Sequence, residues 1–231
     1  MVWAMSRFVF VYARSDSSRL PGKPMMTLSG RKVIDIVLER ASRVGADEFV
    51  LLTSQREVDD VLAAHCTRQG VPVVRGHPTN LVSRSLQAIE ETGARFFLRV
   101  NGDSPFFEPE LARQAMAHTE NVQMISNIIT RCFPYGVSVE WIEAEFYKTQ
   151  ASFSTEEENE HVTSHLYRHV DPMRVLSLTQ SRDDSWLRLA LDTPEDYAFL
   201  SGEIGESVVS GVPYWDAFDL DHPELSVGFS V

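Results

Sequence analysis

Cationic and small residues crowd one short stretch of the chain, from Arg14 to Lys23, which reads RSDSSRLPGK. Arginine and lysine side chains, together with free backbone N–H groups, are the groups that hold a polyphosphate. Gly22 would let the backbone turn tightly, and Pro21 would stiffen the loop. Because the stretch is not a Walker A sequence, its residues alone leave two interpretations open, a phosphate-binding loop and an ordinary basic surface loop.

Asp103 lies just after an apolar run, in the stretch Asn101-Gly102-Asp103-Ser104-Pro105. A carboxylate opposite the basic loop would suit Mg²⁺, which takes one or two protein carboxylates and completes its shell with water and phosphate oxygens. The other interpretation is an aspartate that caps a turn. Asp192 precedes Thr-Pro-Glu-Asp, and from its neighbours alone it is better interpreted as a helix cap.

His161, His165 and His169 are spaced four residues apart, so on a helix they would share one face and could bind zinc. A solvated helix face explains such a row more simply. The sequence has no Gly-x-Ser-x-Gly elbow, and neither Cys66 nor Cys132 has a recognisable catalytic setting. Direct displacement at phosphorus needs no covalent residue, only positioning and charge neutralisation.

Apolar runs and helical patterns alternate along the first hundred residues. Strands are predicted at 8–12, 49–52, 71–74 and 96–100, and helices at 33–41, 58–66 and 82–89. This order indicates a mostly parallel sheet with helices on both faces, whose ligands bind beyond the carboxyl ends of the strands. One crevice is therefore expected to gather the polar groups at the strand ends, which are Arg14 to Lys23, Thr53, Ser54, Arg75 and Asn101 to Asp103.

Beyond residue 130 the alternation is less regular. Strands are predicted at 137–140, 175–178 and 186–191, and helices around 142–149, from 156–160 onward and at 194–200. The stretch from Val208 has no clear pattern. The proline at position 72 favours an early or edge position for its strand.

Length and composition indicate one α/β domain. The 231 residues carry a net charge of −12, which argues against general binding to nucleic acid or to anionic membranes. No apolar run approaches the roughly 20 residues that span a bilayer, and the first residues do not resemble a signal peptide. We therefore expect a cytoplasmic protein whose two cysteines are reduced.

The basic loop, Arg-x-x-Ser-x-Arg-Leu-Pro-Gly-Lys, resembles the nucleotide-binding loop of the cytidylyltransferases that make CMP-activated sugars, among which the CMP-Kdo and CMP-sialic acid synthetases are more distant. Five further motifs are similar to those of this family and follow in the same order: Arg75-Gly76, Gly102-Asp103-Ser104-Pro105, Phe133-Pro134-Tyr135-Gly136, Glu160-His161-Val162-Thr163 and Asp192-Thr193-Pro194-Glu195-Asp196. The segment His77 to Asn80 departs from the family, since it lacks the usual acidic residues.

The resemblance implies a Rossmann-like α/β/α sandwich of the nucleotidyltransferase, GT-A-like type. It implies transfer of CMP from CTP to a sugar acid, with Mg²⁺ as cofactor and release of pyrophosphate. It also implies a homodimer formed by an excursion at residues 130–180. Four sets of site residues follow: catalytic Arg14, Lys23 and Asp103; nucleotide-binding Arg14, Ser17, Arg19, Gly22, Lys23, Thr53, Ser54 and Arg75; acceptor-binding Tyr135, Glu140, His161 and Thr163; and the metal ligands Asp103 and Asp192.

Three alternatives stay open. A glycosyltransferase on a related fold would use a ready-made nucleotide sugar, but it would normally show an Asp-x-Asp motif, and Asn101 stands at the first of these positions. A nucleotide-binding scaffold without chemistry is compatible with the altered segment His77 to Asn80. A cytidylyltransferase acting on a phosphorylated or phosphonate acceptor would share most of the expected site.

Overall fold

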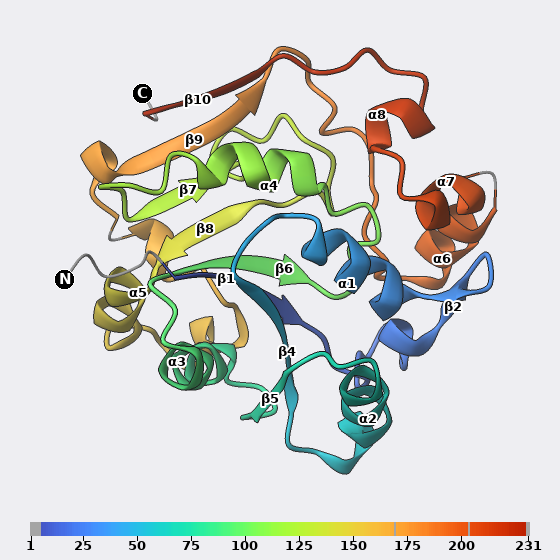
Figure 1. Ribbon diagram of the computed structural model, residues 1–231, viewed down its shortest axis with the longest axis horizontal. Coiled ribbons are helices and arrows are strands. Elements are labelled where there is room, and N and C mark those ends of the chain that lie inside the picture. The colour runs from blue at the N-terminus through green and yellow to red at the C-terminus, as the bar shows by residue number, and fades with distance from the viewer. Residues whose placement is uncertain (1–5, 169, 203, 230–231) are drawn as a thin grey trace.

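An eight-stranded sheet forms the centre of the computed structural model, which describes residues 6–168, 170–202 and 204–229 (Figure 1). Its strands are β1 (Arg7–Tyr12), β4 (Glu48–Ser54), β5 (Val73–Gly76), β6 (Phe96–Asn101), β7 (Met124–Ser126), β8 (Glu140–Glu143), β9 (Val175–Gln180) and β10 (Leu225–Phe229). Across the sheet they run in the order β10-β9-β7-β8-β6-β1-β4-β5. A separate two-stranded ribbon pairs β2 (Thr27–Leu28) with β3 (Arg31–Lys32).

The half of the sheet built from β1, β4, β5 and β6 is parallel, as predicted. β1 pairs in parallel with β4 and β6, β4 with β5, and β7 with β9. β8 is antiparallel to both of its neighbours, and β10 is antiparallel to β9. β5 begins after Pro72 and lies at the edge of the sheet, which confirms the position expected from that proline.

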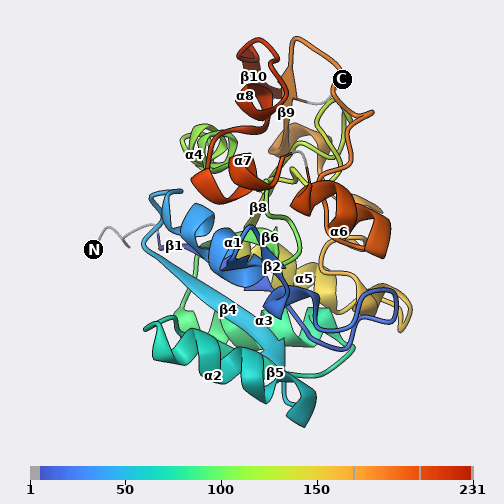
Figure 2. The ribbon, with the colours of Figure 1, turned by 90° about the vertical axis from the view of Figure 1, so that its right-hand side faces the viewer.

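Helices cover both faces of the sheet (Figure 1, Figure 2). Alternate residues of β1 show why, because Val9 and Val11 pack into one core and Phe10 and Tyr12 into the other. The first core also takes residues of α1 (Val33–Ser42), α2 (Asp60–Arg68), α4 (Pro109–Met116), α6 (Pro194–Ser201), α7 (Gly205–Ser210) and α8 (Tyr214–Ala217). The second core takes residues of α3 (Leu81–Thr92) and α5 (Ala144–Ala151). The predicted α/β/α sandwich is therefore confirmed.

Two predicted elements are wrong. Residues 186–191 form no strand but only a single bridge, between Arg188 and Tyr135, because the chain passes Tyr135 once and then turns toward the start of α6. The helix expected from 156–160 is one 3-10 turn, Glu158–Glu160, which has no buried residue and thus no apolar stripe to hold a longer helix. His161 and His165 consequently share no helix face, and His169 lies outside the described residues.

Several boundaries shift. The strand expected at 137–140 starts only at Glu140, and the helix after it starts at Ala144. Other 3-10 turns are Lys23–Met25, Glu57–Asp59, Leu166–Arg168 and Pro172–Arg174. None of the helices in the described ranges is long and apolar enough to cross a membrane.

The last part of the chain completes the sheet and one core. β10 pairs along the full length of β9, and Tyr214 and Trp215 of α8 are buried. The Tyr214 hydroxyl lies 2.8 Å from a carboxylate oxygen of Asp184, which also accepts two hydrogen bonds from Arg182, at 2.6 and 2.9 Å. These contacts tie the segment after β9 to the C-terminal elements.

Candidate active site

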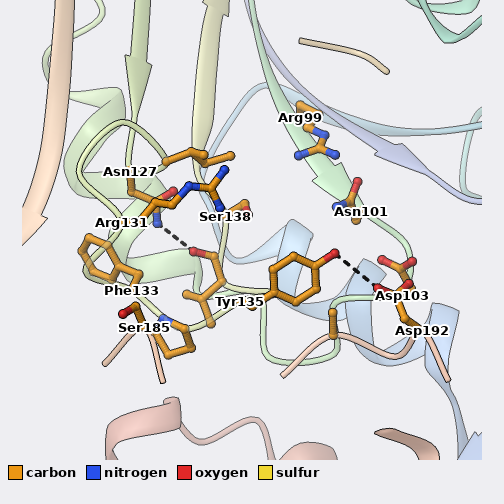
Figure 3. A pocket seen from close by; sticks show the side chains of 15 residues that line it. Arg99, Asn101, Asp103, Asn127, Arg131, Phe133, Tyr135, Ser138, Ser185 and Asp192 are labelled. Carbon is orange, nitrogen blue, oxygen red and sulfur yellow. Dashed lines mark hydrogen bonds between the residues drawn. The ribbon is translucent and has the colours of Figure 1, made fainter. Parts of the chain in front are cut away.

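Two pockets meet at the carboxyl ends of β1 and β6. The first, which we call the loop pocket, has a volume of about 280 Å³ and is lined by the basic loop from Arg14 to Lys23 and by Arg84. The second, which we call the aromatic pocket, has a volume of about 330 Å³ and is lined by residues from 127–138 and from 185–192 (Figure 3). Both pockets are lined by Asn101, Asp103 and Asp192, so a ligand in one could contact a ligand in the other.

Hydrogen bonds close the basic loop and anchor it to the end of β4. Gly22 has a φ of 72°, the left-handed conformation that glycine favours, and its N–H donates to the Ser15 carbonyl at 2.8 Å. The Ser15 N–H in turn donates to Asp59 at 2.6 Å. Asp59 is buried and also accepts a hydrogen bond from the Ser54 hydroxyl. The end of β4 therefore holds the loop in place through a buried carboxylate.

Gly102 lets the end of β6 approach the start of the loop. A Cβ at this position would lie 2.6 Å from the Cβ of Ala13, closer than real side chains come. The Gly102 N–H donates to the Tyr12 carbonyl at 2.8 Å. This close contact places Asp103, the next residue, beside the basic loop.

Lys23 joins the two aspartates. Its Nζ contacts a carboxylate oxygen of Asp103 and lies 3.1 Å from Asp192 Oδ1. Burial alone would lower the pKa of Lys23, but the two carboxylates outweigh it and raise that pKa. Burial would likewise raise the pKa of Asp192, but Lys23 and Arg19 lower it. At neutral pH the centre of the site is thus a lysine cation that contacts Asp103 and lies beside an ionised Asp192.

The carboxylate of Asp192 can contact Lys23 because another residue caps α6. Thr193 is the N-cap, and its hydroxyl accepts from the Asp196 N–H while Asp196 accepts from the Thr193 N–H. Asp192 instead accepts hydrogen bonds from Tyr135 Oη at 3.2 Å and Arg188 Nη2 at 3.1 Å. The helix-cap interpretation of Asp192 is therefore wrong.

A family model described as cytidylyltransferase matches residues 8–202 of this chain. The chain belongs to the cytidylyltransferase family. It is a CTP-dependent nucleotidyltransferase, and this activity class excludes the glycosyltransferase alternative.

Relatives in sequence and in structure agree with that family. The chain is 32% identical over 197 residues to spore coat polysaccharide biosynthesis protein SpsF of Bacillus subtilis, covering 81% of each chain. It is 30% identical to 3-deoxy-manno-octulosonate cytidylyltransferase of Nitrosococcus oceani over 56% of this chain and half of that one. A cytidylyltransferase from Leptospira borgpetersenii has the same fold, with a TM-score of 0.85, 24% identity and 93% coverage of both chains.

Some predicted nucleotide-binding residues of this cytidylyltransferase lie together and others do not. Arg14, Ser17, Arg19 and Lys23 line the loop pocket. Three residues at strand ends line neither pocket, namely Thr53, Ser54 and Arg75. For these three, the expectation that all strand ends share one crevice is wrong.

Each of these three residues has its own surroundings. Thr53 is buried, and Ser54 bonds to the anchoring Asp59. Arg75 forms an ion pair with Asp60 at 2.6 Å and donates to the Ser54 and Arg56 carbonyls. Ser54, at the end of β4, therefore supports the basic loop through Asp59.

Of the four predicted acceptor-binding residues, one lines a pocket and three do not. Tyr135 lines the aromatic pocket, and burial together with Asp192 raises its pKa, which keeps the hydroxyl a donor. Glu140 is fully buried and lines neither pocket, because Arg99 and Tyr167 enclose its carboxylate. His161 and Thr163 also line neither pocket.

Two arginines of the aromatic pocket were not predicted as site residues from the sequence. Arg99 and Arg131 line the aromatic pocket. Arg84 lines the loop pocket and donates to the His77 and Pro78 carbonyls at 2.5 and 3.0 Å, so it shapes the segment that departs from the family. For Arg99 a signal existed, since an arginine inside an apolar strand needs a buried partner.

Proposed function

We propose that this protein transfers CMP from CTP to a sugar acid of the nonulosonic or Kdo-like kind, with release of pyrophosphate, in the synthesis of a surface polysaccharide. The observation that carries the proposal is the meeting of Lys23, Asp103 and Asp192 where the two pockets join. The names of two relatives support the pathway and the acceptor class, namely a spore coat polysaccharide protein and a 3-deoxy-manno-octulosonate cytidylyltransferase.

The loop pocket would hold the triphosphate. Arg14, Arg19 and Lys23 supply three positive charges along its wall, and Lys23 lies closest to the junction with the aromatic pocket. An acceptor hydroxyl from the aromatic pocket would attack the α-phosphorus in line, the bond from that phosphorus to the pyrophosphate oxygen would break, and the hydroxyl proton would pass to solvent. Lys23 would stabilise the charge that develops on the leaving pyrophosphate.

Asp103 and Asp192 would hold Mg²⁺. The donor set fits, since both carboxylates contact the Lys23 ammonium and so lie close enough to share one cation, and the described residues place no third acidic, histidine or cysteine ligand with them. Such a small set suits an ion that takes most of its shell from water and phosphate oxygens. Bound there, Mg²⁺ would neutralise phosphate charge and orient the triphosphate.

The proposal is tested by measuring pyrophosphate release with each of the four nucleoside triphosphates against a panel of sugar acids, sugar phosphates and phosphonates. We expect release with CTP and at least one sugar acid, and none after Asp103→Asn. Release only with sugar phosphates or phosphonates would support the alternative acceptor class. Release with another nucleotide in preference to CTP would contradict the proposed donor.

A further inference from the structure

Arg99 reaches into the aromatic pocket with part of its hydrogen-bonding capacity unused. Within the described ranges it donates one hydrogen bond, from Nη1 to Glu140 Oε2 at 2.8 Å. Its Nε is buried and has no hydrogen-bond partner there. Figure 3 shows the guanidinium turned toward the interior of the pocket, between Asn101 and Ser138. Nη2, the remaining nitrogen, has no hydrogen bond to a described residue and is the donor left for a ligand.

The position of Arg99 is fixed by a network across three strands. Arg99 of β6 lies directly opposite Glu140 of β8, which lies opposite Ser126 of β7. Glu140 also accepts a hydrogen bond from Tyr167 at 2.6 Å, and the Tyr167 hydroxyl lies 2.8 Å from Ser126 Oγ. Burial alone would lower the pKa of Arg99, but Glu140 raises it. The network therefore fixes the charged guanidinium of Arg99, and Glu140 occupies its Nη1.

Nη2 can therefore donate a charge-assisted hydrogen bond to a carboxylate oxygen of a ligand in the pocket. Arg131 adds a second cation to the pocket wall, and it forms no ion pair with any described residue. Figure 3 shows Arg131 on the opposite side of the pocket from Asp103 and Asp192. An acid group would be attracted to the arginines and repelled by the aspartates, so it would enter the pocket in one orientation.

We propose that Arg99, held by Glu140 and Tyr167, recognises the carboxylate of the acceptor, and that Arg131 assists it. This inference rests on the proposed function, because it assigns the residue that selects a sugar acid over a neutral sugar. Binding the acid group at Arg99 leaves the sugar hydroxyls toward Asp103, Asp192 and Lys23, where the α-phosphate would lie. Glu140 and Tyr167 act as positioning residues rather than as direct acceptor contacts.

The test compares sugar acids with their carboxamides, which keep the shape and lose the charge. The probes are 3-deoxy-manno-octulosonate, N-acetylneuraminate and glucuronate, each paired with its carboxamide. Binding is measured by calorimetry without CTP, and turnover by pyrophosphate release with CTP. The variants are Arg99→Lys and the double variant Arg99→Gln with Glu140→Gln, which avoids a buried carboxylate without a partner. Arg174→Gln, which breaks the surface pair with Glu143, is the matched control.

We expect the wild-type protein and Arg174→Gln to bind at least one acid about 30-fold more tightly than its carboxamide, in the range of a hydrogen-bonded charge pair. In the double variant this preference should fall below about threefold, and Arg99→Lys should keep part of it, while KM for CTP stays within twofold. Thermal melts identify any variant that fails to fold, in which case the other Arg99 variant decides.

The outcomes separate the inference from the proposed function. Arg99-dependent binding of an acid without CTP turnover would refute the proposed function and support the inference. Turnover that treats acid and carboxamide alike would support cytidylyl transfer and overturn the role of Arg99. The inference also fails if no acid binds better than its carboxamide, if the preference survives in folded Arg99 variants, or if sugar phosphates bind at Arg99 in preference to acids.

Discussion

Replacing Lys23 by methionine removes a cation that contacts both active-site aspartates, while most of the side-chain volume stays. Lys23 and Asp192 are 12% and 8% exposed in their side chains, and Asp103 is 20% exposed, so the three charges are only weakly screened by solvent. In the described chain Asp103 forms an ion pair with Lys23 alone, whereas Asp192 keeps Arg188 at 3.1 Å and Arg19 at 3.5 Å. Removing the lysine cation therefore leaves mainly Asp103 without an ion-pair partner among the described residues.

The size of the effect follows from those partners. Breaking a buried ion pair so that one charge is left alone costs about 3–5 kcal/mol. Because Asp103 is partly exposed and Asp192 keeps two cations, we expect a smaller loss, of about 2–3 kcal/mol in the free energy of unfolding. For a chain of this length that corresponds to a melting temperature lower by about 4–12 °C. Mg²⁺ should recover part of this loss, since it binds the folded carboxylates.

Activity should not recover with stability. Mg²⁺ can neutralise the aspartates, but it does not replace the lysine that would meet the leaving pyrophosphate, so turnover should stay at least tenfold below wild type. Thermal melts with and without Mg²⁺ are measured beside pyrophosphate release, with Lys148→Met, a surface lysine paired with Glu145, as the matched control. Wild-type turnover in Lys23→Met, or a melting temperature equal to that of the control, would refute this account of the site.

Four further predictions concern other parts of the molecule. Asp103→Asn and Asp192→Asn should each abolish Mg²⁺-dependent pyrophosphate release with the fold intact, whereas residual activity in EDTA would speak against the metal site. Asp59→Ala, which frees the Ser15 N–H, should raise KM for CTP about tenfold, as steady-state kinetics would show. Burial would raise the pKa of Asp184, but hydrogen bonds from Arg182, Tyr214 and Gln180 lower it, so ionised Asp184 stabilises the fold above the ordinary carboxyl pKa and this stabilisation is lost as the pH falls. Thermal melts between about pH 5 and pH 3 should therefore show a larger loss of stability for wild type than for Asp184→Asn. Light scattering at micromolar concentration should give a homodimer formed through residues 130–180, and a monomer would contradict that proposal.

The sequence predicts the first half of the fold well because the relevant signals are local. Apolar runs mark β1, β4 and β6, and their alternation with helical patterns along the chain predicts a mostly parallel sheet. The basic loop and Asp103 could be found for the same reason, since each directly follows such a run. These features need no knowledge of distant contacts.

The rest depends on contacts between distant segments. Asp59 looks like an exposed helix residue in sequence, yet it is buried because Ser15 and Ser54 bond to it. Glu140 follows an apolar stretch, and only the pairing of β6 with β8 shows that Arg99 encloses it. Residues 186–191 alternate like a strand, but their alternation serves packing around the pocket rather than pairing with a neighbour.

The part of the chain matched by the family model ends at residue 202, but the folded unit does not end there. β10 closes the outer edge of β9, and Tyr214 and the Asp221 carbonyl hold Asp184 and Arg182, which precede the pocket residues Ser185 and Asp192. A minimal enzyme cut at the family boundary would keep every proposed catalytic side chain and lose the support of the segment that carries Ser185 and Asp192. Through this tether, substitutions in the C-terminal segment would act on the lining of the aromatic pocket without changing a residue that lines it.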